Sequence, residues 1–171
     1  MFLILVVLFF VISNNETVVR PQTDVVANKP ELKNTAELEN IRADDLYRLV
    51  NSERTKNGLS PLNKDARLDI SAMDKFNDMV ARNYWDHNTP DGSEPWVYID
   101  KHSPSYTFAA ENLAYSFFDS QLLVWGWMAS PTHRENILDQ KVTHVGYAVC
   151  ESPNFIDQGK QIIVVQHFVQ L

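Results

Sequence analysis

The chain has 171 residues, of which 44% are hydrophobic and 11% aromatic. This composition supplies enough apolar surface for one packed domain and excludes an intrinsically disordered protein. The formal net charge is -7, the sequence pI is about 5.1, and no dense run of Lys and Arg occurs along the chain. Because phosphate backbones are bound by basic surfaces, we expect no nucleic acid among the partners.

The first thirteen residues, MFLILVVLFFVIS, carry no charged side chain, and a polar segment follows them at once. This run is short for a membrane span, which needs about 20 residues, but it suits the apolar region of a secretion signal. No basic region precedes it and no clear small-residue cleavage site follows, so an export signal and a truncated membrane anchor both stay open. We therefore expect an extracellular or cell-surface protein, with residues 1–13 as its signal or membrane tether.

Residues 14–40 contain two prolines and several Asn and Thr without sustained periodicity. Such a composition predicts an exposed polar linker, followed by one folded domain over residues 41–171. Cys150 is the only cysteine, so the chain forms no internal disulfide. It lies in an alternating, strand-like segment, which favours a packing role over a nucleophilic one.

The first predicted helix of the domain carries Leu46, Leu49 and Val50 at helical spacing. Gly58 is expected to terminate this helix, with Pro61 just beyond it.

A second helix is expected to start at the capping residue Asp65. Its apolar face consists of Leu68, Ala72, Phe76, Met79 and Val80. The turn at residues 90–92 interrupts the periodicity, since Pro and Gly favour turn geometry. Ser93 is then expected to cap a third helix with Pro95 in its first turn. His87 is thus placed on a loop between two helices.

A further helix capped by Asp119 or Ser120 is indicated by the apolar spacing of Leu122, Leu123 and Trp127. The chain ends in two β-rich runs at residues 143–152 and 161–171, which we expect to pair in antiparallel fashion. Helices followed by strands predict an α+β fold, with helices packed on an antiparallel sheet.

The segment WMASPTHRENIL combines Ser130, Pro131 and His133. Ser at the N-cap and Pro at the first helical position are typical of a helix start, so a simple capped helix explains the motif. The same reading places His133 near a helix N-terminus, where the dipole disfavours the imidazolium. A neutral imidazole is what a metal ion or a proton acceptor requires.

His87 and Glu111 are the other candidates for chemistry. Glu111 lies between apolar residues in AAENLA, and a buried carboxylate is costly without a partner. No local spacing joins these residues to each other. His102, His144 and His167 are weaker candidates, expected to be exposed or satisfied by hydrogen bonds.

The segments WDHNTPDG, AENLA and WMASPTHRENIL follow one another in this order, after VNSERTKNGLSPLNKDARLDISA. Together they resemble the bacterial branch of the CAP superfamily, which comprises cysteine-rich secretory, antigen 5 and pathogenesis-related 1 proteins and is also called the SCP domain. The resemblance covers about residues 43–170. It implies an α-β-α sandwich with a central antiparallel sheet flanked by helices.

The resemblance also implies a shallow cleft with two histidines and two acidic residues. His87 resembles the first histidine, Glu111 the glutamate of the Gly-Glu-Asn motif, and His133 the second histidine. The second acidic residue is missing, because residues 128–130 read Met-Ala-Ser where relatives place it. Ala110 stands where the family usually has glycine.

We therefore expect a cleft formed by His87, Glu111, Ser130 and His133, in which the two histidines can share a divalent metal such as zinc. Glu111 is expected to orient one imidazole rather than to bind the ion. The resemblance favours an extracytoplasmic binding module for an unknown ligand, such as a lipid, a peptide or a wall component. The alternative is a peptidase-like, metal-assisted hydrolase in which Glu111 is the catalytic candidate that activates a metal-bound water.

Overall fold

The computed structural model describes residues 41–103 and 105–171. The expectations for residues 1–13 and 14–40 lie outside this part. The elements in chain order are α1 (Ala43–Lys56), β1 (Asn63–Lys64), α2 (Ala66–Ala81), α3 (Trp96–Asp100), β2 (Phe108–Tyr115), α4 (Ser120–Ala129), α5 (Pro131–Leu138), β3 (His144–Ser152) and β4 (Gln161–Gln170). None of the described helices combines the length and the apolar character that crossing a membrane requires.

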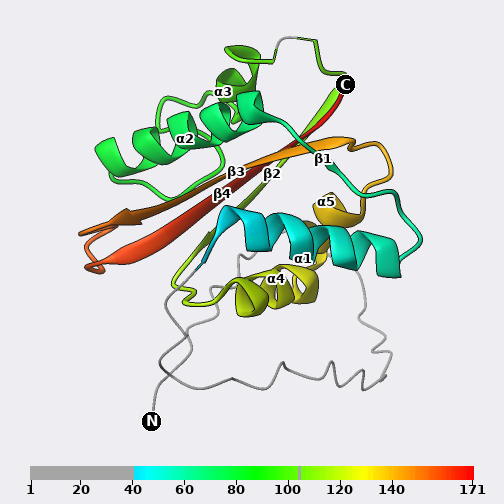
Figure 1. The fold of residues 1–171 in the computed structure, drawn as a ribbon. Helices are drawn as coiled ribbons and strands as arrows, with labels where there is room; N and C mark the ends of the chain where they lie inside the picture. The colour runs from blue at the N-terminus through cyan, green and yellow to red at the C-terminus, as the bar shows by residue number, and fades with distance from the viewer. Residues whose placement is uncertain (1–40, 104) are drawn as a thin grey trace, which may run out of the picture.

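The four described strands form one sheet in the order β1-β3-β4-β2. Strand β4 pairs in antiparallel fashion with β3, as expected, and also with β2, a pairing that the sequence did not specify. The two-residue β1 adds to β3 in parallel, a pairing that the sequence did not predict. Helices α2 and α3 cover one face of the sheet and α1, α4 and α5 the other (Figure 1). The predicted α-β-α sandwich is therefore confirmed.

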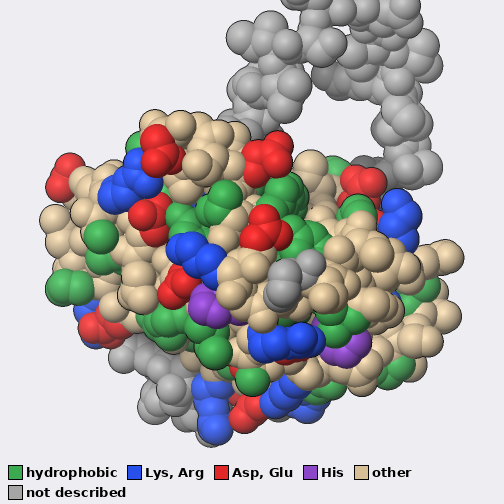
Figure 2. Space-filling view, turned by 90° about the horizontal axis from the view of Figure 1, so that it is seen from above, with side chains coloured by type: hydrophobic (Ala, Val, Ile, Leu, Met, Phe, Trp, Pro, Cys, Tyr) green, Lys and Arg blue, Asp and Glu red, His purple; other side chains and the backbone are tan. Residues whose placement is uncertain are grey.

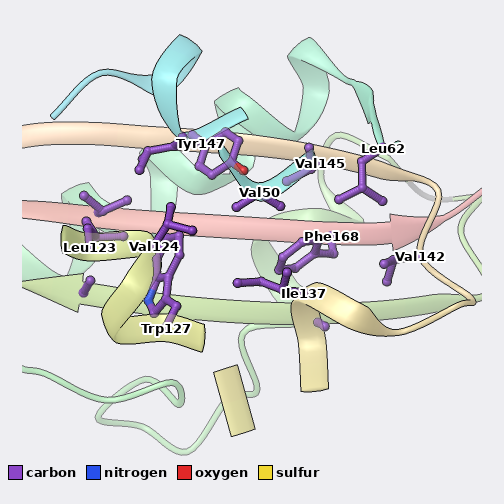
Figure 3. Close-up of a cluster of buried hydrophobic side chains, with 14 of the residues drawn as sticks. Val50, Leu62, Leu123, Val124, Trp127, Ile137, Val142, Val145, Tyr147 and Phe168 are labelled. Carbon is purple, nitrogen blue, oxygen red and sulfur yellow. The ribbon is translucent and has the colours of Figure 1, made fainter. Parts of the chain in front are cut away.

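The largest apolar cluster lies between the sheet and the layer of α1, α4 and α5 (Figure 3). Its fully buried members include Val50 from α1, Leu123 from α4 and Phe168 from β4. Trp127 of α4 also packs here and donates from Nε1 to the carbonyl of Leu113, at 3.3 Å. The core thus fixes α4 against the outer edge of β2.

On the opposite face, α2 approaches β3 very closely at Gly146. A Cβ atom at this position would lie 2.4 Å from the backbone N of Asp69 and 2.4 Å from the backbone C of Leu68. Asp69 also accepts a hydrogen bond from the N–H of Tyr147, at 2.8 Å. These contacts fix the height of α2 above the sheet, and with it the residues that α2 contributes to the site.

The predicted caps of three helices are confirmed. Asp65 accepts from the N–H of Arg67 at the start of α2, and Asp119 does the same for Gln121 at the start of α4. Gly58 follows α1 with φ of 75°, a left-handed conformation that glycine adopts without strain.

The prediction that Ser93 caps the third helix is wrong. Helix α3 starts only at Trp96, with Pro95 in the N-cap position and no side-chain capping bond. Ser93 instead belongs to the preceding turn, where its N–H donates to Thr89 Oγ1 at 2.9 Å and its carbonyl accepts from the N–H of Thr89. The hydrogen bonds with Thr89 therefore hold Ser93 in the turn, and the helix begins three residues later.

Candidate functional site

Glu111 lies at the centre of the site, on β2 and directly opposite His167 of β4. Its side chain is only 1% exposed. Oε1 lies 2.6 Å from Nδ1 of His87, and Oε2 lies 2.9 Å from Nε2 of His167. The partner that a buried carboxylate requires is thus supplied by two imidazoles.

The charge state of Glu111 fixes the direction of these hydrogen bonds. Burial opposes ionisation, but the hydrogen bonds from His167 and His87 outweigh it, so the pKa of Glu111 is lowered. An ionised carboxylate only accepts hydrogen bonds, so each imidazole donates an N–H to it. Nε2 of His87 is left available, and the His87 side chain is 53% exposed.

His167 is part of the site, although the sequence placed it among the weaker candidates. The side chain is fully buried, and its Nδ1 lies 2.7 Å from Oγ of Ser71 on α2. It is satisfied by hydrogen bonds, as expected, but one of them is to Glu111. A signal was available, because His167 and Glu111 are both polar residues in apolar strand segments and each needs a partner.

Lys75 of α2 is a second residue that the sequence did not single out. It is fully buried and donates to the carbonyls of Asp86 at 2.8 Å and His87 at 2.6 Å, and to the hydroxyl of Tyr84 at 3.2 Å. Burial lowers the pKa of Lys75, and the charge of Glu111 partly opposes this shift. Lys75 thus holds the loop backbone that carries His87. The sequence could have indicated its burial, because Lys75 lies on the apolar face of α2.

His133 lies in the first turn of α5, as predicted. Ser130 occupies the N-cap position without a side-chain capping bond, and its Oγ lies 2.9 Å from His133 Nδ1 instead. Burial, and then the charge of His87, lower the pKa of His133. The neutral imidazole expected from the helix dipole is therefore favoured here by burial and a neighbouring histidine.

Two asparagines fasten α5 to β2. Asn112 donates from Nδ2 to the carbonyl of His133, at 3.2 Å. Asn136 donates to the carbonyl of Glu111 at 3.1 Å and to Oδ1 of Asn112 at 2.9 Å. These hydrogen bonds hold the helix that carries His133 beside the strand that carries Glu111.

An open groove of about 360 Å³ reaches the site. The residues of its lining that matter here are His87, Trp96, Phe108, Ala109, Glu111 and Asn136. Ser130 and His133 are not part of this lining. On the face over α2 and α3, acidic, basic and apolar side chains intermingle, and histidine side chains reach the surface among them (Figure 2).

The remaining histidines and the cysteine have ordinary surroundings. His102 is hydrogen-bonded to Asp74 at 2.9 Å, and His144 to its neighbour Thr143 at 2.9 Å. Cys150 is partly buried, and burial raises the pKa of its thiol. A raised thiol pKa agrees with a packing role rather than a nucleophilic one.

The predicted metal site would use two imidazole nitrogens, one from His87 and one from His133. Nδ1 of His87 is bonded to Glu111 and Nδ1 of His133 to Ser130, which leaves Nε2 of both rings for an ion. Within the described ranges, no group of three or more His, Cys, Asp or Glu could hold a metal. A metal ion at these two rings would therefore have at most two protein ligands, with water or a bound ligand completing its coordination.

Comparison with known proteins identifies relatives of this chain. The model of the cysteine-rich secretory protein family, CAP, matches residues 47–168. The chain is 40% identical over 104 residues to the uncharacterised protein YkwD of Bacillus subtilis (strain 168), a match that covers 61% of this chain and 40% of that protein. It is 31% identical over 101 residues to the uncharacterised membrane protein YlbC of the same organism, covering 59% of this chain and 29% of YlbC. The matches thus span less than half the length of either relative.

A solved structure agrees with these sequence matches. The crystal structure of an extracellular protein containing an SCP domain, from Bacillus anthracis strain Ames, has a TM-score of 0.65 and 23% identity. The match covers 75% of this chain and 40% of that protein. The family match contains every residue of the site described above, from Ser71 to His167. The chain belongs to the cysteine-rich secretory protein (CAP) family.

Proposed function

We propose that the chain is an extracytoplasmic binding module, whose cleft binds a ligand next to a divalent metal held by His87 and His133. One observation carries this proposal. The buried carboxylate of Glu111 accepts from Nδ1 of His87 and leaves Nε2 of a half-exposed ring beside an open groove. Carboxylates that fix the orientation and tautomer of an imidazole are typical neighbours of metal-binding histidines.

Zinc suits this donor set, because it is commonly bound by neutral imidazoles. The lowered pKa of His133 favours the form that binds metal at neutral pH. When bound, the ion would offer an electrophilic centre to an oxygen of the ligand. Glu111 and Ser130 would orient the two rings from behind, each through Nδ1.

A location outside the cytoplasm is part of the proposal. It is supported by the uncharged run of residues 1–13, by the extracellular SCP-domain protein of Bacillus anthracis and by the membrane protein YlbC. Cell fractionation with an antibody to the domain should find the native protein in the membrane or extracellular fraction. Recovery solely from the cytosol, with residues 1–13 intact, would contradict it.

The binding module is preferred over the hydrolase for a geometric reason. The side chain of Glu111 is only 1% exposed and accepts from an imidazole on each oxygen, so it is poorly placed to take a proton from an attacking water. The second acidic residue of the family cleft is also missing at residues 128–130. We therefore expect no zinc-dependent turnover of peptide substrates, and turnover that is lost in Glu111→Gln would restore the hydrolase.

Calorimetric titration of zinc into the full chain tests the metal site. We expect His87→Ala and His133→Ala to abolish binding, because each removes one of two ligands. Glu111→Gln should weaken binding by about 10–100-fold, because it removes a carboxylate that orients a ligand. His102→Ala is the matched control and should bind like the wild type. Unchanged zinc binding by His87→Ala would contradict the proposal.

A further inference from the structure

Strand β2 lies at the edge of the described sheet, and its first half lines the groove. It pairs with β4 on one side, while residues 108–111 face the groove. An edge strand presents backbone N–H and C=O groups that can pair with another extended chain.

Two side-chain contacts reveal which backbone groups point outward. Asn136 donates to the carbonyl of Glu111, and Trp127 donates to the carbonyl of Leu113. The two donors come from α4 and α5 and not from β4, and carbonyls two residues apart point to the same side of a strand. The alternation therefore directs the N–H and C=O of Ala109 and the N–H of Glu111 toward the groove.

Apolar rings border this edge on both faces of the sheet. Trp96 packs against the cluster on the α2 and α3 face, and Phe108 packs against the cluster on the opposite face. Successive side chains of an extended segment alternate between two faces, so they would meet these two rings in turn. Residues 108–111 offer about 13 Å of strand, at roughly 3.3 Å per residue.

We infer that the groove binds an extended polypeptide segment, which pairs with β2 as an additional strand. The inference rests on the proposed function, because it names the ligand class of the same cleft. Main-chain hydrogen bonds supply affinity in this mode of recognition, and alternate side-chain contacts supply specificity. The carboxylate of Glu94 in the groove and the net charge of -7 favour a neutral or basic segment.

A lipid is the weaker match for the same groove. A hydrocarbon chain laid on β2 would bury the outward backbone groups without hydrogen-bond partners, which is costly. An extended polypeptide satisfies the same groups.

The test uses the full 171-residue chain and a synthetic library of N-acetylated, C-amidated heptapeptides. The tightest member is then measured against Ala109→Pro and Ala109→Val. Proline removes the N–H of residue 109, which points away from β4, so the hydrogen bonds between β2 and β4 remain. Proline is tolerated at such a position of an edge strand. Valine keeps the N–H and adds similar bulk. We expect proline to weaken peptide binding at least about tenfold relative to valine, the worth of one net hydrogen bond, because valine reports the effect of bulk alone at this position.

A second measurement covers the case in which Ala109→Pro does not fold. The same peptide is N-methylated at alternate residues, in the two possible phases. Pairing with β2 predicts that one phase abolishes binding while the other is tolerated, because only alternate N–H groups face the partner strand. Equal effects of the two phases would overturn the inference.

The outcomes separate this inference from the proposed function. Equal peptide affinity of Ala109→Pro and the wild type would overturn strand pairing. Failure of every peptide, with binding only to phospholipid vesicles or to purified peptidoglycan, would overturn the polypeptide class. Zinc titrations of the same samples would still show the metal site in both cases. Conversely, a peptide result that supports pairing stands even when zinc does not bind.

Discussion

At the scale of single residues, the site depends on charges that the fold removes from water. Glu111 and Lys75 are both buried, and each is surrounded by hydrogen-bond partners rather than by a direct ion pair with the other. A buried charge is tolerated only when such partners replace its hydration. The stability of the protein should therefore depend on the ionised state of Glu111.

The first prediction concerns the pH dependence of this stability. The folded pKa of Glu111 lies below its ordinary value of 4.5, so the unfolded chain binds more protons in acid. The stabilisation is fully present above about pH 4.5 and is lost as the pH falls through the folded pKa. Glu111→Gln should lower the free energy of unfolding at pH 7 by about 3 kcal/mol and flatten its acid dependence. Urea unfolding measured from about pH 3 to about pH 7 follows both effects, because this range covers the ordinary titration of carboxyl groups.

Glu94→Gln is the matched control, since it removes a carboxylate from the exposed side of the same groove. It should leave both the stability and its acid dependence close to those of the wild type. Parallel pH profiles for the wild type and Glu111→Gln would show that the buried carboxylate does not contribute as described.

At the scale of elements, the approach of α2 to β3 decides where Ser71 and Lys75 lie. The approach depends on Gly146, because an added Cβ would meet the helix backbone at 2.4 Å. A backbone segment cannot move aside as a flexible side chain can. The whole helix would have to shift, and the residues that support His167 and the His87 loop would shift with it.

We therefore predict that Gly146→Ala lowers the free energy of unfolding by about 3 kcal/mol, the upper end of the usual cost of overpacking. Gly126→Ala in α4 is the control. Its Cβ would lie 2.8 Å from the tip of the Phe117 ring, a side chain that can move, and alanine gains about 1 kcal/mol of helix propensity. Its net effect should be small. Similar losses for both variants in chemical unfolding would contradict this account of α2.

At the scale of the whole molecule, β4 holds the sandwich together. It pairs with both β2 and β3, and its buried side chains contribute to the clusters on both faces. The described elements lie between Ala43 and Gln170, and the polar composition of residues 14–40 without sustained periodicity predicts a linker rather than a part of the core. The folded domain should therefore not need the segment that precedes it.

We predict that a truncated protein of residues 41–171 shows the circular dichroism and cooperative melting of the full chain. Removal of residues 161–171 should abolish the cooperative transition, because it deletes the central strand of the sheet. Removal of Leu171 alone, which is 44% exposed, is the control and should cost little. An unfolded 41–171 protein would show that residues 1–40 belong to the fold.

Much of the architecture could be predicted because its signals are local. Apolar spacing located α1, α2 and α4, and the caps at Asp65 and Asp119 lie where short polar side chains precede those patterns. The use of local signals alone also explains why the predicted helix cap at Ser93 is wrong. A residue that suits a helix cap suits a turn equally well, and the hydrogen bonds with Thr89 decided between the two.

The sequence by itself determined which residues were the candidates, His87, Glu111 and His133, because a carboxylate in an apolar strand and a histidine near a helix start each require an explanation. Only the tertiary structure decided how they are held. Glu111 meets His167 across 56 residues of sequence, and His167 meets Ser71 across 96. Such contacts depend on strand register and on the height of α2 above the sheet, which no local pattern encodes. Local sequence patterns therefore identify the residues of the site, and long-range packing sets their geometry.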